Sequence, residues 1–164
     1  MATGRRQGGG RAEDALAVSL RLLGGRELST RQLTQRLEQR GFEAAAIEQA
    51  VTRLTAAGAL DDERVARAVA RTRAGVKRQG RARVVRELTA IGIDRDAAEQ
   101  AVGDVFGEID EDAMLEQALE RHLRRPGALS DSASRRRVYA ALVRQGFAPE
   151  AVMHAVRARS KSRR

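Results

Sequence analysis

Hydrophobic residues follow one spacing pattern that occurs three times along the chain. In the first copy Leu33 is followed by Leu37, then by Gly41 and Phe42. Positions four apart lie on one face of a helix, so the two leucines predict an apolar stripe. Gly41 predicts where this helix ends, because glycine adopts the left-handed conformation after a helix at little cost. We expect Phe42 to fold back onto the helix that it follows.

The same spacing pattern is repeated after 51 and then after 54 residues. The second copy contains Leu88 and Gly92, and the third contains Leu142, Gly146 and Phe147. A helix with its own apolar stripe is expected before and after each copy. Repeats of this period are typical of stacked helical units. The sequence therefore predicts an all-α fold, with three tandem three-helix repeats forming an elongated, curved array.

Breaks between the periodic segments give the expected boundaries. Residues 1–12 are glycine-rich, basic and aperiodic, which predicts a disordered tail. Three-helix repeats are expected over residues 13–60, 61–109 and 110–158. A basic C-terminal tail is expected over residues 159–164.

Composition limits the compartment and the kind of core. Only 2% of the 164 residues are aromatic, so the core is expected to be aliphatic and each repeat alone marginal. The absence of cysteine excludes disulfides and thiolate metal sites. No apolar run reaches the ~20 residues of a membrane span, and the N-terminus lacks an apolar signal segment. We expect a cytoplasmic protein without membrane contact.

The positive charges are gathered in runs, and the net charge of +9 favours an anionic partner. One run holds seven cations and no acid, residues 96–120 hold nine acids and no Lys or Arg, and a second basic run follows. A solvated face is one explanation, but the absence of acids favours a surface for phosphate or carboxylate groups. The candidate contact residues are Arg71, Arg73, Lys77, Arg78, Arg81, Arg83, Arg86, Arg135, Arg136, Arg137 and Arg144. Because stacked repeats place equivalent positions on one side, we expect the arginines of 81–83 and 135–137 to be neighbours.

No pattern supports catalysis, a metal site or a cofactor. His122 and His154 are the only histidines, neither accompanies a nucleophile pattern, and both are expected to be exposed. The acidic run lacks the alternation and the glycine of a calcium loop. With so few aromatic residues, base stacking is expected to add little to any binding of nucleic acid.

Four local motifs together resemble the RecX regulatory family. They are Leu-Leu-x-x-Arg-x-Leu-Ser-x-x-Gln-Leu-x-x-x-Leu over residues 22–37, Gly-Ala-Leu-Asp-Asp over 58–62, Gly-x-x-x-Val-x-x-Glu-Leu over 80–88, and Arg-Gln-Gly-Phe over 144–147. Asp61 and Asp62 belong to the most specific of them, and the resemblance extends over residues 14–156. The family commonly has an aromatic residue soon after the two aspartates, where this chain has Val65.

The resemblance implies a modulator of the RecA recombinase, and with the residue patterns above we expect a monomer with no enzymatic activity and no cofactor. Such a protein would bind along the RecA–DNA filament and inhibit its ATPase, strand-exchange and co-protease activities. The cations from Arg71 to Arg86 and the basic C-terminal arm predict weak, nonspecific binding of single- and double-stranded DNA. One alternative is a helical protein that binds DNA directly, without a recombinase, and another is a passive scaffold with a basic surface. Direct reading of the major groove is disfavoured, because the basic residues are spread over two repeats.

Overall fold

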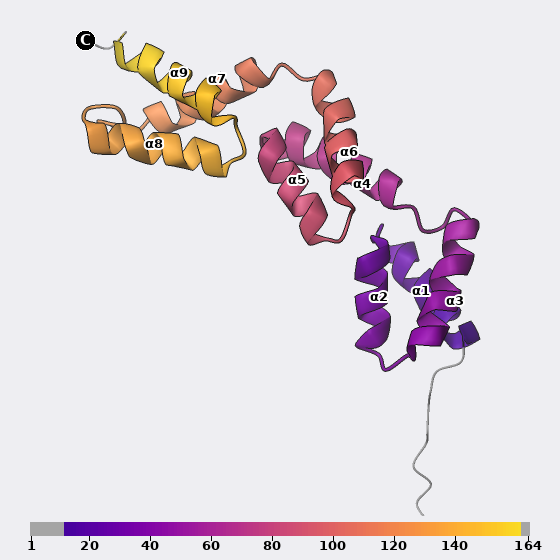
Figure 1. Ribbon diagram of the computed structural model, residues 1–164. Coiled ribbons are helices and arrows are strands. Elements are labelled where there is room, and N and C mark those ends of the chain that lie inside the picture. Colours follow the sequence, from indigo (N-terminus) through magenta and orange to yellow (C-terminus); the bar gives the residue numbers. More distant parts are fainter. Residues whose placement is uncertain (1–11, 162–164) are drawn as a thin grey trace, which may run out of the picture. The chain divides into compact units, whose positions relative to one another are not determined.

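The computed structural model describes residues 12–161, which form nine α-helices and one π-helical turn and contain no strand (Figure 1). The first three helices are α1 (Ala12–Gly25), α2 (Thr30–Glu38) and α3 (Ala44–Ala56). Then come α4 (Asp62–Arg71), the π-turn η1 (Thr72–Val76), α5 (Arg81–Ala90) and α6 (Arg95–Gly107). The last three are α7 (Glu111–Leu123), α8 (Ser132–Arg144) and α9 (Pro149–Lys161). The all-α class and the succession of three-helix groups are confirmed.

The expected N-terminal tail lies outside the described residues except for Ala12, which begins α1, and half of the expected C-terminal tail lies outside them. Residues 1–11 and 162–164 are not described. Residues 159–161, which we assigned to the C-terminal tail, instead complete helix α9. Arg159 explains this extension, because its Nη2 lies 2.9 Å from Glu116 Oε2 and 2.8 Å from Glu120 Oε1 on α7.

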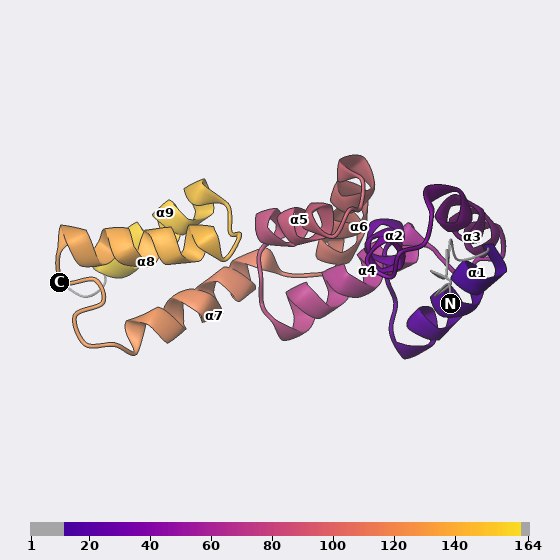
Figure 2. The same cartoon turned by 90° about the horizontal axis from the view of Figure 1, so that it is seen from below.

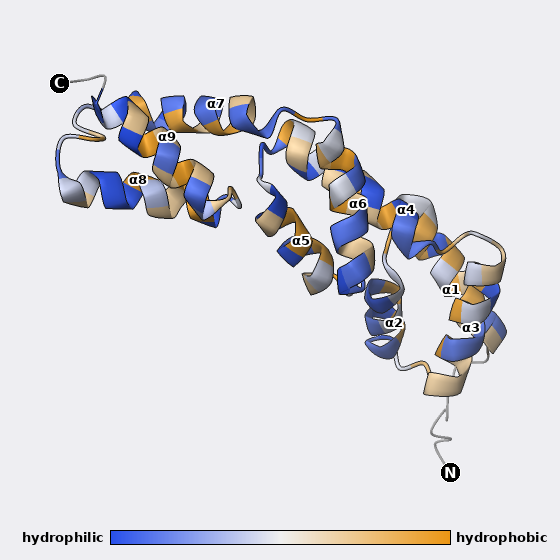
Figure 3. Cartoon of the chain, turned by 45° about the horizontal axis from the view of Figure 1, so that its top comes forward, coloured by the Kyte–Doolittle hydropathy of each residue, from blue (hydrophilic) through white to orange (hydrophobic). Residues whose placement is uncertain are grey.

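The described chain divides into two compact units. The first ends at Val65 and also takes in Ile91–Ile93, and the second contains Ala66–Ala90 and the chain from Asp94 onward. Within the second unit, α7, α8 and α9 pack against one another (Figure 2). Most helices carry both hydrophobic and hydrophilic residues around their circumference, as amphipathic helices do (Figure 3).

The leucine that stands four residues before the glycine lies in the core in every copy of the spacing pattern. Leu37, Leu88 and Leu142 are all 0% exposed. Phe147 is also buried, whereas Phe42 is only half-buried and packs against the edge of a cluster formed by Leu28, Leu33, Leu37, Ile47, Leu54 and Leu60. The aliphatic core that the composition indicated is therefore present in the structure.

The predicted glycine stops are present in all three copies of the spacing pattern. Gly41, Gly92 and Gly146 have φ angles of 81°, 91° and 99°. At the first stop the Phe42 amide donates to Leu37 O (3.2 Å), and at the third the Phe147 amide donates to Leu142 O (3.3 Å). This bond satisfies a carbonyl at the end of the helix and draws the apolar residue back onto it.

Two of these glycine turns also lie against the start of an earlier middle helix. A Cβ atom on Gly146 would be 2.6 Å from the backbone nitrogen of Arg83, and one on Gly92 would be 2.4 Å from Arg31 Cβ. The carbonyl before each glycine is satisfied there: Ser29 Oγ donates to Ile91 O, and the Gly80 amide donates to Gln145 O (2.9 Å). Gly41 has no such neighbour within 4 Å. Glycine is thus required twice over at 92 and 146, for its φ angle and for the close approach.

Asp61 and Asp62 cap two different helices. Asp61 Oδ1 accepts a hydrogen bond from the Arg64 amide in the first turn of α4 (2.9 Å). Asp62 Oδ1 accepts one from the amide of Thr30, the first residue of α2 (2.7 Å). Both carboxylates therefore occupy the positive end of a helix, where amides lack partners within the helix. The pair of aspartates ties the start of α4 to the start of α2.

Replacing Gly146 should cost more stability than replacing Gly41. Gly41→Ala forces alanine into a left-handed conformation, at about 1–2 kcal/mol. Gly146→Ala has the same strain and also drives a methyl group into the backbone of α5, for about 1–3 kcal/mol more. Urea unfolding of both variants measures the difference, and equal losses would show that the close approach contributes nothing.

Removing the carboxylate of Asp62 should weaken the start of α2. We expect Asp62→Ala to lower the free energy of unfolding by about 0.5–2 kcal/mol, the usual effect of losing a cap. Asp62→Asn is the matched control, because its amide oxygen still accepts a hydrogen bond, and it should lose less. Hydrogen exchange at Thr30 reports the site directly, and unchanged protection in Asp62→Ala would contradict the assignment.

Candidate functional site

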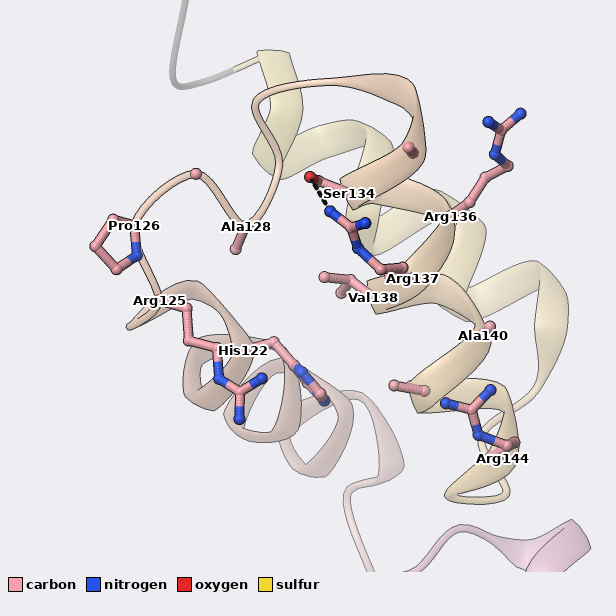
Figure 4. A pocket seen from close by; sticks show the side chains of 13 residues that line it. His122, Arg125, Pro126, Ala128, Ser134, Arg136, Arg137, Val138, Ala140 and Arg144 are labelled. Carbon is pink, nitrogen blue, oxygen red and sulfur yellow. Dashed lines mark hydrogen bonds between the residues drawn. The ribbon is translucent and has the colours of Figure 1, made fainter.

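A basic cavity lies between the C-terminal end of α7 and helix α8 in the third repeat (Figure 4). The chain leaves α7 after Leu123 and turns through Pro126 and Gly127, where φ is 71°. It enters α8 at Ser132. The cavity has a volume of about 730 Å³, and none of the described residues that line it is acidic. Its polar and charged lining residues are His122, Arg125, Ser134, Arg136, Arg137 and Arg144.

The three consecutive arginines of α8 point in different directions. Arg137 points into the cavity, where its Nη2 donates to Ser134 Oγ (2.8 Å), and Arg136 points away from it (Figure 4). Arg135 Nη1 donates to Leu129 O (3.4 Å). Successive residues of a helix are about 100° apart, so three in a row cannot share one face. The predicted arginine cluster is therefore divided between two faces of α8.

Asp131 compensates for the cations that follow it at the start of α8. Its Oδ1 accepts the Ser134 amide (2.8 Å), and its Oδ2 accepts the hydroxyls of Ser134 (2.9 Å) and Ser130 (3.0 Å). These bonds lower the pKa of Asp131 to about 2, with the Ser134 amide contributing most. The helix end is thus capped from within the third repeat.

The cavity keeps positive charge that the protein does not neutralise. Among the described residues, Arg125, Arg136 and Arg144 form no ion pair. Guanidinium groups suit phosphate and carboxylate oxygens, which they can bind through two parallel hydrogen bonds. The arrangement can therefore hold an anionic group of a partner.

His122 is half-buried in this cavity, so the expectation that it would be exposed was wrong. Its side chain points from α7 toward α8 (Figure 4). Burial lowers the pKa of His122 below its ordinary value, and the neighbouring charge of Arg125 lowers it further. A bound anion would oppose both effects by favouring the imidazolium.

Three of the seven cations in the basic run from Arg71 to Arg86 are held by acids from outside the run. Arg73 Nε lies 2.7 Å from Glu87 Oε2, and Arg83 Nε donates to Glu87 Oε1 (2.9 Å). Burial alone would raise the pKa of Glu87, but the hydrogen bond from Arg83 and the charge of Arg73 lower it overall. Arg81 pairs with Glu111, and its guanidinium carbon is 5.1 Å from the centre of the Phe106 ring. These arginines stabilise the second unit of the fold.

The other four cations of that run remain without an ion pair in the described chain. They are Arg71, Lys77, Arg78 and Arg86. Arg78 has a positive φ of 53°, which is uncommon for a residue with a side chain. Arg86 and Arg81 line a separate cavity of about 530 Å³.

The arginines of 81–83 and 135–137 do not form one cluster. The Gly80 amide bonds to Gln145 O, so the start of α5 lies against the end of α8. Residues 135–137 lie at the other end of α8, about 15 Å away at 1.5 Å per residue. The expectation that these arginines would be neighbours is therefore wrong.

Neither a metal site nor a membrane span is found in the described part of the chain. Between residues 12 and 161, no three His, Asp or Glu side chains are grouped so that they could hold a metal ion. None of the helices there has the length and apolar character to cross a bilayer.

Sequence reasoning missed the α7 side of the cavity. His122 and Arg125 belong to a helix end whose only local signal is the turn at Pro126 and Gly127. The partnership of Arg83 with Glu87 could have been found from their spacing of four residues. That of Arg73 with Glu87 could not, because it joins η1 to α5 across fourteen positions.

Fold and site together describe an all-helical protein of tandem three-helix repeats with a basic surface. Sequence models of the first and second three-helix domains of RecX match residues 15–54 and 61–102. The protein named Regulatory protein RecX of Pelodictyon phaeoclathratiforme is 31% identical over 146 residues, covering 89% of each chain. That of Treponema pallidum is 36% identical over 143 residues, covering 85% of this chain and 87% of the relative. The chain therefore belongs to the RecX family.

Solved structures share the fold. The crystal structure of RecX from Lactobacillus salivarius superposes with a TM-score of 0.73 at 16% identity, covering 89% of this chain and 94% of that one. A second crystal structure, of a regulatory protein RecX, gives 0.79 at 16% identity and covers 88% of this chain and 72% of that one. The helical repeat architecture is therefore retained at low sequence identity.

The cap at Asp131 should make the third repeat sensitive to acid. Because the pKa of Asp131 in the folded chain is about 2, below the ~3.9 of an unperturbed aspartate, its contribution is present above pH ~4. That contribution is lost as the pH falls toward 2. The urea midpoint of the parent should exceed that of Asp131→Asn at pH 5, and the difference should shrink on acidification. An Asp131 carboxyl NMR signal that titrates near 4 would contradict the cap.

Proposed function

We propose that this chain regulates the RecA recombinase by binding the RecA–DNA filament and inhibiting its ATPase, strand-exchange and co-protease activities. Membership of the RecX family supports this function, since the relatives are named regulatory proteins. The observation that carries it is the cavity of the third repeat, whose arginines have no acidic partner in the described chain. The protein would act in the cytoplasm as a monomer.

A surface of this kind would bind through several weak contacts. Each exposed ion pair contributes little by itself, so Arg125, Arg137 and Arg144 would have to act together. Contacts to phosphates of a single strand would make binding salt-dependent, with a log–log slope of about −0.7 per phosphate. Naked DNA would therefore be bound weakly and without sequence preference. Carboxylates of the recombinase could be bound by the same guanidinium groups.

The contacts of the middle helices give less support to direct reading of DNA. A helix-turn-helix protein inserts the start of its recognition helix into the major groove. Here Ile91 and Gly92 cover the start of α2, and Gln145 and Gly146 cover the start of α5. Those two helix starts are covered by other parts of the protein, so they are not available to enter the major groove. This favours a regulator that binds its partner through charged side chains.

Reversing the charge of the cavity should abolish regulation without unfolding the chain. The triple variant carries Arg125→Glu, Arg137→Glu and Arg144→Glu. All three sites are exposed, so the substitutions leave the core unchanged. We expect inhibition of the DNA-dependent ATPase of RecA to fall at least tenfold, because three contacts of about 0.5 kcal/mol each are lost and replaced by repulsion. Circular dichroism checks that the helices remain.

The matched control places the same three charge reversals on the first repeat. Arg21→Glu, Arg40→Glu and Arg53→Glu change the net charge by the same amount at exposed sites in the first unit. This control should inhibit nearly as well as the parent at 0.1 M salt. Equal loss in both triples would indicate that only net charge matters, and full inhibition by the cavity triple would exclude the cavity as the contact.

A further inference from the structure

A second, smaller depression on α8 contains the only tyrosine of the chain. It lies between α8 and α9 and has a volume of about 280 Å³. We call it the tyrosine groove. Its apolar part is formed by Tyr139, Met153 and Val156, and its charged part by Arg135, Arg136 and Arg157. Arg136 is common to this groove and the basic cavity, and it points away from the latter (Figure 4).

Tyr139 stands apart from the other aromatic residues in where its ring lies. Phe106 and Phe147 are 1% and 4% exposed, and Phe42 packs against the core of the first unit. Tyr139 is half-buried and lines the groove, and its hydroxyl has no hydrogen-bond partner among the described residues. Met153 beside it is 39% exposed, although large hydrophobic side chains are otherwise mostly covered. The groove thus contains a partly exposed aromatic side chain beside an exposed methionine.

The charges around the ring indicate what kind of molecule fits. No acidic residue lines the groove, and neither Arg136 nor Arg157 forms an ion pair in the described chain. A partly exposed aromatic ring with cations beside it is the combination that binds single-stranded nucleic acid, where bases stack and phosphates meet positive charge. Pockets for drug-sized ligands begin at about 300 Å³, so the groove is of a size for one base. A duplex would not serve, because its bases are already stacked on one another.

We propose that the tyrosine groove binds one unstacked base of single-stranded DNA. The base stacks on the ring of Tyr139 beside Met153, and the flanking phosphates lie at Arg136 and Arg157. Stacking would then contribute at this one position, in contrast to the expectation from the low aromatic content. The proposal rests on the proposed function only for the source of the strand, which would be the DNA of the filament.

The composition supplies a direct probe of the groove. With one tyrosine and no tryptophan, the tyrosine emission of the full chain comes from Tyr139 alone. Titration with a 12-nucleotide oligo(dT) should quench this emission, after correction for absorption by the strand. An abasic strand of the same length and charge should not quench it, because it offers phosphates without bases.

Affinity measurements then separate stacking from charge. By fluorescence anisotropy of a labelled strand, Tyr139→Leu should bind oligo(dT) about 5- to 150-fold more weakly, the range expected for loss of one stacked base at about 1–3 kcal/mol. Tyr139→Phe, which keeps the ring, should stay within about twofold of the parent. Binding of the abasic strand should be alike in all three proteins. Thermal melts followed by circular dichroism confirm that both variants fold.

Three results would overturn the proposal. One is oligo(dT) binding by Tyr139→Leu equal to that of the parent, and another is an equal loss for oligo(dT) and the abasic strand. The third is unchanged oligo(dT) binding with weaker binding to DNA-free recombinase, which would make the groove a protein contact. Inhibition of the RecA ATPase is measured separately with the parent chain. If the parent fails to inhibit while stacking is found, the proposed function fails and the groove remains a site for DNA.

Discussion

The contact between a glycine turn and the start of an earlier middle helix is the constraint on which the repeat architecture depends. Gly92 approaches Arg31, and Gly146 approaches Arg83, so closely that a Cβ atom would collide with the facing residue. The carbonyl before each glycine receives its hydrogen bond from the facing helix start, through the Ser29 hydroxyl in one case and the Gly80 amide in the other. Carbonyls left without a partner at one helix end are thus satisfied by donors at the start of another helix, as buried polar groups require.

The third repeat ends this series with different chemistry at the equivalent place. Ser134 occupies the position that Ser29 and Gly80 hold in the earlier repeats, but it bonds to Asp131 of its own repeat. Helix α8 therefore begins at Ser132, three positions earlier in the repeat than α5 does. Because this cap comes from its own repeat, no glycine turn in the described chain is bonded to the start of α8. The start of α8 and its arginines remain available to a partner.

A difference between the second and third repeats also explains which arginines have no carboxylate partner in the described chain. Glu87 holds Arg73 and Arg83 in the second repeat, and the equivalent position of the third repeat is Ala141. Ala141 lines the basic cavity, so within the described chain Arg137 meets no carboxylate there and donates to the hydroxyl of Ser134 instead. A single difference between repeats thus converts a structural ion pair into a surface with unneutralised charge. The basic cavity and the tyrosine groove lie on two faces of α8, the helix where this difference falls.

The helices, their glycine ends and the threefold repeat of this RecX family member could be predicted from the sequence alone, because they follow from local spacing. Leucines four apart and a glycine after them need only neighbours along the chain to have their effect. The three-dimensional packing decided that Gly92 and Gly146 are also required for close approach, whereas Gly41 is not. It also decided that Arg81 is paired with Glu111 while Arg136 forms no ion pair in the described chain, and that His122 is half-buried in the cavity between α7 and α8. These outcomes depend on groups brought together from distant positions, and no local pattern records which distant groups meet.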